Sequence, residues 1–360
     1  MSRIFNFAAG PAVLPDSVLE RIRDDLPDWQ GRGMSVMEVS HRGKDFVEVA
    51  ERAEQSFRRL LGVPAGYKVL FMQGGATAQF AAVPLNLAGV GDTACFLNTG
   101  QWSIKAIAEA RRYVEVEVLT DEQASNYTTV PEATSIKVPG GAAYLHYTPN
   151  ETIGGVEFPY VPNPGSALLV ADMSSTILSR PIDVSKFALI YAGAQKNIGP
   201  SGLTVVVVRE DLPGRARKLT PTVLDYAAMA SAGSMPNTPP TFAWYVAGLV
   251  FDWIEAGGGL EAMGQRNAAK AGMLYDYLDT SGFYANPVHP GCRSWMNVPF
   301  TLHRSELDKQ FLLESRTAGL ANLEGHRSVG GMRASLYNAM PVEGVKALIE
   351  FMQDFAQRHG

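Results

Sequence analysis

Seven short apolar runs in the middle of the chain constrain its fold more than any other feature. They are almost continuous in apolar residues rather than alternating with polar ones, so both faces of each predicted strand should be covered. Helical stretches separate most of the runs, and this order is typical of an α/β sheet with largely parallel strands. The runs are residues 68–72, 93–97, 114–119, 142–147, 167–170, 188–191 and 203–208.

Helices are expected before the sheet and a mixed region after it. Residues 16–62 have the pattern of two helices, with Asp16 expected to cap the first and Gly62 to end the second. Three consecutive glycines at 257–259 then mark a break, and the sequence beyond them alternates between helix and strand patterns. We expect an N-terminal segment that associates with the functional site or the small domain, a large domain and a smaller α+β domain, over residues 1–15, 16–258 and 259–360.

Composition excludes several classes of protein. The chain has 360 residues, 46% of them hydrophobic, which is enough for a large core. Its net charge of -5 argues against a nucleic-acid binder. Cys95 and Cys292 are too few for a disulfide framework and are expected to be buried thiols. With no run of about 18 apolar residues, no secretory signal and no metal motif, we expect a cytoplasmic protein without a membrane partner or metal.

A lysine follows the sixth apolar run in an unusual loop. Residues 191–202 read Tyr-Ala-Gly-Ala-Gln-Lys-Asn-Ile-Gly-Pro-Ser-Gly, so Lys196 lies among small residues that let a ligand approach the backbone. The apolar run that follows places this loop at the edge of the core. A desolvated lysine has a lowered pKa and becomes a usable amine nucleophile, although a lone lysine in a turn is usually a surface residue.

An acid ends the fifth run, 24 residues before that lysine. Asp172 is expected to be buried and therefore to need a partner. It has two interpretations: a cap for a following helix, or a carboxylate that pairs with a protonated pyridine nitrogen. The spacing leaves room for one crossover between neighbouring strands, so Asp172 and Lys196 are expected at one site.

Two further segments fit a ligand site at the same edge. Residues 73–80, Gln-Gly-Gly-Ala-Thr-Ala-Gln-Phe, lead from a strand into a helix and predict a phosphate cradle built from free N–H groups and the Thr77 hydroxyl. They lack the glycine and lysine spacing of nucleotide loops. Trp102 follows another strand end, where it would either stack on a planar ring or be buried as a structural residue.

Six motifs together resemble the phosphoserine aminotransferase family over nearly the whole chain. That resemblance implies a fold-type-I pyridoxal phosphate (PLP) enzyme, a homodimer with active sites shared between subunits. It implies transamination of 3-phosphohydroxypyruvate with glutamate to O-phospho-L-serine and 2-oxoglutarate, and activity on 4-phosphohydroxy-L-threonine in pyridoxine biosynthesis. The motifs are Phe-Asn-Phe…Gly-Pro (5–11), Val-Ser-His-Arg-Gly (39–43), Asn-Glu-Thr-Ile (150–153), Tyr-Ala-Gly-Ala-Gln-Lys-Asn (191–197), Asn-Thr-Pro-Pro (237–240) and Gly-Met-Arg-Ala-Ser (331–335).

The resemblance also implies a role for each site residue. Lys196 would hold the cofactor as a Schiff base, Asp172 would pair with the pyridine nitrogen, and Trp102 would stack on the ring. Thr152 would bond the phenolic oxygen of the ring. The cofactor phosphate would be held by Ala76, Thr77 and Gln195, with Asn237 and Thr238 from the partner subunit. The substrate would be bound by Arg333 at its α-carboxylate and by His41, Arg42, His326 and Arg327 at its distal anion.

Two positions depart from the family pattern. Some members carry arginine where this chain has Thr77, and some carry serine where it has Ala9. Binding of the distal anion therefore lacks one cation and one hydroxyl. Two His-Arg pairs far apart in a chain with only six histidines still favour a cationic pocket, because arginine binds carboxylate or phosphate with two parallel hydrogen bonds.

Three alternatives stay open at this point. The nearest keeps the cofactor and changes the reaction, to another class-V-like aminotransferase or a desulfurase. A desulfurase would need a catalytic cysteine on a mobile loop, and only Cys292 is a candidate. A hydrolase without PLP would need a Gly-x-Ser-x-Gly or His-Glu-x-x-His motif, and the sequence has neither. A binding protein could keep the fold without catalysis.

Overall fold

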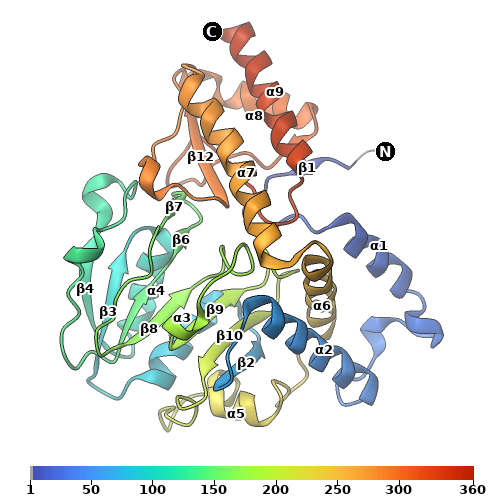
Figure 1. The fold of residues 1–360 in the computed structure, drawn as a ribbon, viewed down its shortest axis with the longest axis vertical. Helices are drawn as coiled ribbons and strands as arrows, with labels where there is room; N and C mark the ends of the chain where they lie inside the picture. Colours follow the sequence, from blue (N-terminus) through green and yellow to red (C-terminus); the bar gives the residue numbers. More distant parts are fainter. Residues whose placement is uncertain (1–2) are drawn as a thin grey trace.

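The computed structural model describes residues 3–360, which form two lobes joined by a long helix (Figure 1). The lower lobe in this view contains the large sheet, and the upper lobe contains a small sheet with the C-terminal helices. The N-terminal segment runs beside the upper lobe. Within residues 3–360, no helix combines the length and the apolar character needed to cross a membrane.

All seven apolar runs form strands of one sheet, as the sequence predicts. Along the sheet the order is β2-β10-β9-β8-β5-β3-β4. Strand β10 is antiparallel to both of its neighbours, and the other neighbouring pairs are parallel. The bounds are β2 (Tyr67–Met72), β3 (Thr93–Asn98), β4 (Glu115–Asp121), β5 (Tyr144–Tyr147), β8 (Leu168–Asp172), β9 (Leu189–Gly193) and β10 (Thr204–Arg209).

Helices cover both faces of this sheet, which explains why its inner strands are apolar. The edge strand β4 alternates instead, with Glu115 and Glu117 exposed. Successive side chains of β10 point to opposite faces, so that Val205 lies in one apolar cluster and Val206 in the other. Helices α2 (Lys44–Leu61) and α6 (Thr241–Ala256) contribute to the first cluster, and α3 (Gly75–Leu87) and α4 (Gln101–Ala110) contribute to the second. Phe71 stacks on Trp244 of α6 with ring centroids 4.4 Å apart.

The two N-terminal helices form where they are expected, although one predicted cap is wrong. Helix α1 (Asp16–Asp25) has Pro15 at its N-cap position, and no side chain caps it. Asp16 instead pairs with Arg3. Gly62 ends α2 as predicted, because it adopts the left-handed conformation with φ of 63°.

The C-terminal region contains its own apolar cluster. Helix α7 (Gly259–Thr280) links the lobes: Leu260 and Met263 belong to the first cluster of the large sheet, whereas Leu274 and Leu278 belong to the C-terminal one. The remaining helices are α5 (Tyr226–Ser231), α8 (Asp308–Thr317) and α9 (Val342–His359). The remaining strands are β1 (Phe5–Asn6), β6 (Asn150–Glu151), β7 (Val156–Glu157), β11 (Tyr284–Ala285), β12 (Asn297–Leu302), β13 (Leu320–Ala321) and β14 (Met332–Ser335).

The N-terminal segment contacts both lobes. Strand β1 pairs with β13 in the upper lobe. A few residues later, the N–H of Ala12 donates to the carbonyl of Gln195 (2.9 Å), and the carbonyl of Ala9 accepts from the Tyr337 hydroxyl (2.9 Å). The segment therefore passes directly beside the loop that carries Lys196.

The topology brings six strand ends to one edge of the large sheet, and the ends of β2, β3, β5, β8 and β9 carry the site. Strands β9, β8, β5 and β3 are parallel to one another, and β2 points the same way because β10 is antiparallel to both β2 and β9. Ligands of such sheets bind outside the carboxyl ends of the strands. The loops that follow these five strands carry the residues of the site described next.

Candidate active site

A cavity of about 330 Å³ opens at this edge of the sheet. It lies between loops that follow β2, β3, β5, β8 and β9, which are far apart in the sequence. Seven of the predicted cofactor residues line it. The full lining is Gly74, Gly75, Ala76, Thr77, Trp102, Thr148, Asn150, Thr152, Asp172, Ser174, Ser175, Gly193, Gln195, Lys196 and Gly202.

Lys196 projects from the loop between β9 and β10 into this cavity. The residue is only 7% exposed, and its Nζ donates to the Thr152 hydroxyl oxygen at 2.7 Å. Burial lowers the pKa of Lys196 to about 8, although the Asp172 and Glu151 carboxylates oppose that effect. About a tenth of the amine is therefore unprotonated and nucleophilic at pH 7, far more than for an ordinary lysine.

Asp172 ends β8 on the strand next to that of Lys196. Its Oδ1 accepts from the Ser174 hydroxyl (2.6 Å) and the Ser174 backbone N–H (3.0 Å). Burial raises the pKa of Asp172, and these hydrogen bonds and the Lys196 ammonium counteract the shift. No helix follows directly, which excludes the interpretation of Asp172 as a helix cap.

The segment after β2 forms a turn into helix α3, as predicted for a phosphate cradle. Gly74 and Gly75 both have positive φ, at 92° and 66°, and a Cβ on Gly74 would lie 2.5 Å from that of Ala78. The first backbone bond of the turn runs from the Ala78 N–H to the Gly74 carbonyl. The N–H groups of the preceding residues, Ala76 and Thr77 among them, lie at the cavity and are available to an anion.

Trp102 lies in the first turn of α4 and forms one wall of the cavity. Its ring centroid is 5.5 Å from the Lys196 Nζ. The Trp102 Nε1 and the Thr148 hydroxyl are buried and have no hydrogen-bond partner among residues 3–360. The cavity therefore combines an aromatic wall, a carboxylate, a buried amine and a helix N-terminus. These groups suit a flat ring that carries a phosphate.

Five predicted substrate residues lie outside the cavity lining. Among them, His326 lies close enough to Arg333 and Arg327 for both cations to lower the pKa of its imidazole, in addition to the larger effect of burial. Arg333 is half-buried, its Nε has no partner among residues 3–360, and its charge also lowers the pKa of Lys196. His41 and Arg42 precede α2 and do not line the cavity of their own chain.

The predicted partner-subunit residues also lie outside the cavity. Asn237 and Thr238 are exposed in the loop before α6. The Thr238 carbonyl accepts from the Gln73 side-chain amide at 3.3 Å, so this loop contacts the start of the cradle segment from outside.

Sequence reasoning missed several polar residues at the site. Thr148 and Ser174 line the cavity, and Lys105 lies with its Nζ 4.3 Å from the Trp102 ring centroid. Lys105 is also among the cations that lower the pKa of His326. One signal was present: Lys105 follows Trp102 by three residues in a helix, so both lie on one face.

The cysteines contradict the desulfurase alternative. Cys95 is part of β3, and burial raises the pKa of its thiol to about 11. The Cys292 Sγ donates to the carbonyls of His289 and Thr128, and burial raises its pKa as well. Both thiols are buried, as predicted, and neither lines the cavity.

Comparison with known proteins agrees with this geometry. Residues 4–348 match the model of the family "Aminotransferase class-V". The chain is 59% identical to the phosphoserine aminotransferase of Hahella chejuensis over 357 residues and 57% identical to that of Azotobacter vinelandii over 358, covering 99% of this chain and of each relative. The structure of a phosphoserine aminotransferase from Bacillus circulans subsp. alkalophilus superimposes with a TM-score of 0.97 at 49% identity, covering 99% of both chains. The PLP-bound enzyme from Trichomonas vaginalis gives 0.93 at 41% identity, covering 98% of this chain and 100% of that one.

Fold and site together define a PLP-dependent aminotransferase of fold type I. This excludes the hydrolase and the non-catalytic binding protein. Within that class, the chain belongs to the phosphoserine aminotransferase family. Its cofactor is pyridoxal phosphate.

Proposed function

We propose that this enzyme interconverts 3-phosphohydroxypyruvate and glutamate with O-phospho-L-serine and 2-oxoglutarate, as a step of serine biosynthesis. All four molecules carry an anion at each end, so the site needs two separate cationic regions. The observation that carries the proposal is the half-buried Arg333, whose Nε lacks a partner among residues 3–360 although its charge acts on Lys196. A guanidinium in that position suits the α-carboxylate of a bound substrate.

We assign the distal anion to the two His-Arg pairs, His41 with Arg42 and His326 with Arg327. The second pair lies near Arg333 and Lys105 in the same chain, which supports a cationic region on one side of the cavity. The first pair does not reach the cavity of its own chain, so we assign it to the site of a partner subunit. Position 77 carries no cation because it is threonine, and position 9 carries no hydroxyl because it is alanine. The two His-Arg pairs are therefore left to bind the distal anion.

The cofactor residues divide into ring and phosphate groups. Trp102 stacks on the ring, Thr152 bonds the phenolic oxygen, and Asp172 pairs with the pyridine nitrogen. For the phosphate, we assign the helix N-terminus of α3 and the loop before Lys196, together with a partner loop. These phosphate ligands are Ala76, Thr77, Gln195 and, from the partner subunit, the residues corresponding to Asn237 and Thr238.

Bound PLP supplies an electron sink that stabilises negative charge at the substrate Cα. Asp172 holds a proton at the pyridine nitrogen, because a carboxylate beside that atom favours its charged form. With PLP bound, Lys196 would hold the cofactor covalently, and its Nζ, once freed by the substrate amine, would be placed to move a proton at the substrate Cα. Thr152 orients Nζ through the 2.7 Å hydrogen bond that it accepts. Arg333 fixes the carboxylate so that Cα faces the lysine.

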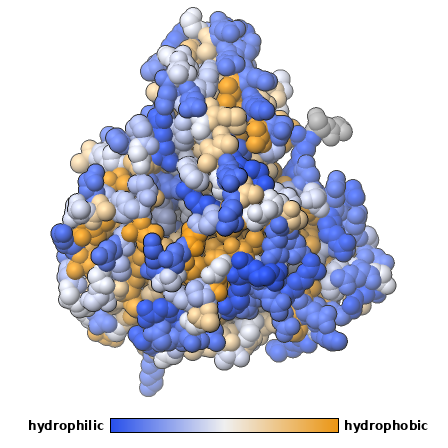
Figure 2. Space-filling view, in the orientation of Figure 1, coloured by the Kyte–Doolittle hydropathy of each residue, from blue (hydrophilic) through white to orange (hydrophobic). Residues whose placement is uncertain are grey.

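We propose a cytoplasmic homodimer with shared active sites. The space-filling view supports a subunit interface on this face of the molecule. Apolar residues gather in the middle of the visible surface, below the upper lobe (Figure 2), and such patches commonly mark interfaces. We further propose that residues 16–258 and 259–360 act as the large and small domains, with residues 1–15 attached to both.

The half-reactions test the substrate assignment directly. The wild-type enzyme is mixed separately with O-phospho-L-serine and with glutamate, and the visible band of the bound cofactor is followed by absorbance. Both should convert the cofactor to its aminated form, whereas alanine should not. Conversion by alanine at the rate of O-phosphoserine would contradict the assignment. The same assay with 4-phosphohydroxy-L-threonine tests our second proposed substrate, in pyridoxine biosynthesis.

Mixing two inactive variants tests the shared site. Lys196→Ala should be inactive alone, and an Asn237→Ala/Thr238→Ala double variant should be inactive at PLP concentrations below its weakened dissociation constant. Subunit exchange should form a heterodimer in which one site carries both lesions and the other is intact. Recovered activity supports sharing. If heterodimers form and no activity returns, the loop serves its own subunit.

A further inference from the structure

Helix α4, which carries Trp102, is capped by a residue from another strand. Its own N-cap residue is Gly100, which has no side chain to accept the free N–H groups of the first turn. Glu151 of β6 takes that position. Its Oε2 accepts from the Trp102 N–H (2.9 Å), and its Oε1 accepts from the N–H and the hydroxyl of Ser103 (both 2.8 Å).

Gly100 leaves room for this carboxylate. A Cβ at that position would lie 2.7 Å from the Glu151 Cδ and 2.8 Å from its Oε2. The φ of Gly100 is 162°, which is extended backbone open to any residue, so conformation does not require glycine there. The lack of space requires glycine instead, because a side chain on residue 100 would displace the Glu151 carboxylate.

Glu151 is linked to the cavity on two sides. It directly precedes Thr152, which accepts the hydrogen bond from Lys196, and it bonds the backbone of Trp102, which also lines the cavity. Glu151 itself is 1% exposed and does not line the cavity. Glu151 thus connects two residues near the lysine: its carboxylate bonds the backbone of Trp102, and the peptide chain joins it to Thr152.

We propose that Glu151 is a positioning residue for the cofactor, which fixes Trp102 against the cofactor ring and holds Thr152 beside Lys196. This inference rests on the proposed function, in which Trp102 and Thr152 contact the cofactor. The position requires a carboxylate rather than an amide. Both carboxylate oxygens of Glu151 accept hydrogen bonds from N–H or O–H donors. In glutamine, an NH₂ group would replace one of these oxygens and would face a donor instead of accepting from it.

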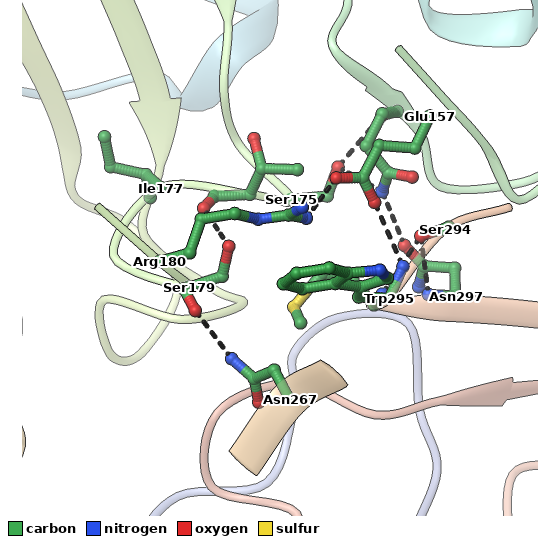
Figure 3. A network of polar contacts seen from close by, with 12 residues as sticks. Glu157, Ser175, Ile177, Ser179, Arg180, Asn267, Ser294, Trp295 and Asn297 are labelled. Atoms are coloured by element: carbon green, nitrogen blue, oxygen red, sulfur yellow. Dashed lines mark hydrogen bonds and ion pairs between the residues drawn. The ribbon is translucent and has the colours of Figure 1, made fainter. Parts of the chain in front are cut away.

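A second buried glutamate on the adjacent strand serves as a matched control. Glu157 of β7 is 7% exposed, pairs with Arg180 and accepts from the Trp295 N–H at 3.0 Å (Figure 3). The Arg180 guanidinium lies 3.8 Å from the centre of the Trp295 ring. This network joins the two lobes outside the cavity, so Glu157→Gln should lower stability without acting on Trp102 or Thr152.

The test compares Glu151→Gln with Glu157→Gln and uses two readouts besides activity. The first is the dissociation constant of PLP from each folded protein, and the second is the visible circular dichroism of the bound cofactor, which reports how the ring is held. Glu151→Gln should weaken PLP binding by about tenfold or more, the scale of one hydrogen bond to a charged group, and should reduce the dichroism. Glu157→Gln should leave both within twofold, whatever its thermal stability.

Gly100→Ala keeps the test decisive if Glu151→Gln does not fold. The added Cβ should push the carboxylate away while its charge remains, and it should produce the same loss of PLP affinity and dichroism. Combining the two substitutions should add little to either alone, because they break one contact. Unchanged PLP binding and dichroism in either single variant would overturn the proposal.

The two hypotheses fail in distinguishable ways. A wild-type enzyme that binds PLP but does not react with O-phosphoserine would contradict the proposed substrate and leave the role of Glu151 to be decided by these binding data. Conversely, a Glu151→Gln enzyme with normal PLP binding would refute the positioning role alone.

Discussion

Lys196 and Lys270 are both buried, but their ammonium groups differ in the number of hydrogen-bond partners that surround them. Lys196 is 7% exposed at the cavity, and its Nζ has a single hydroxyl partner, Thr152. Lys270 is 1% exposed in α7, and its Nζ donates to three backbone carbonyls, those of Leu336, Tyr337 and Met340, at 2.9–3.0 Å. Burial lowers the pKa of both amines, to about 8 and about 7.

A lowered pKa does not by itself mark a reactive amine, because Lys196 and Lys270 share that property. Lys270 does not line the cavity at Lys196, and its three N–H donors all bond the loop between β14 and α9. Lys196 has unused bonding capacity and space for a ligand. Reactivity therefore follows from the partners and the free volume, and the predictions below test that distinction.

Lys196→Ala should have the largest effect. Removing the amine removes both the covalent bond to the cofactor and the general base, so kcat should fall by roughly 10³-fold or more. Borohydride reduction of the wild-type enzyme, followed by peptide mapping, should label Lys196 and leave Lys270 unmodified. A label on Lys270 would contradict the distinction between the two regions.

Asp172→Asn should fold and bind PLP but lose on the order of 10²-fold in rate. A neutral amide cannot keep the pyridine nitrogen protonated, so charge at the substrate Cα is less stabilised. Stopped-flow half-reactions with O-phosphoserine measure the effect. Turnover near the wild-type value would mean that the carboxylate near Lys196 serves only the Ser174 turn.

Lys270→Met should change stability rather than chemistry. Three buried carbonyls lose their donor, which should lower the free energy of unfolding by about 2–4 kcal/mol in denaturant titrations. At temperatures where the variant is folded, kcat should stay within about tenfold of the wild type. A loss as large as that of Lys196→Ala would make Lys270 part of the reaction.

The same variant should also alter how stability depends on pH. The folded pKa of Lys270 lies near 7 and its ordinary value is 10.5, so between these limits the unfolded chain binds more protons than the folded one. Lys270 therefore makes stability rise as pH increases from about 7 to 10.5. Lys270→Met should show a shallower rise than the wild type in this window, and equal slopes would contradict the lowered pKa.

Thr238→Ala should have the smallest effect and asks whether the Lys196 region is completed by a second subunit. The substitution should weaken PLP retention by about 1 kcal/mol, as expected for one lost hydrogen bond to the phosphate. The thermal stability of the apoenzyme should not change, because the exposed side chain has no described partner in its own chain. Equilibrium dialysis of PLP against the wild type measures the difference, and unchanged retention would argue against the shared site.

Local sequence determined the scaffold of this protein and its central chemical pair. Most of the seven runs could be predicted as strands because a sheet covered on both faces makes them almost continuously apolar, although the edge strand β4 alternates. Lys196 and Asp172 stood out because each follows an apolar strand, at the edge where such sheets bind ligands, and the family motifs added residues that no local pattern would have singled out. Asp16 was misassigned as a cap because a first-turn acid and an N-cap acid look alike in sequence.

Only the tertiary structure decided which buried polar groups meet. Lys270 lies in an ordinary helical stretch, between Ala269 and Ala271, and nothing in that stretch indicates three carbonyls from a loop 66–70 residues away. In the same way, nothing near Glu151 indicates that it caps a helix beginning 50 residues earlier, with Gly100 making room for it. Periodicity and the usual N-cap signals depend on neighbours within a few residues, whereas the environment of a buried charge such as Glu151 is set by the packing of distant elements, which burial forces into contact.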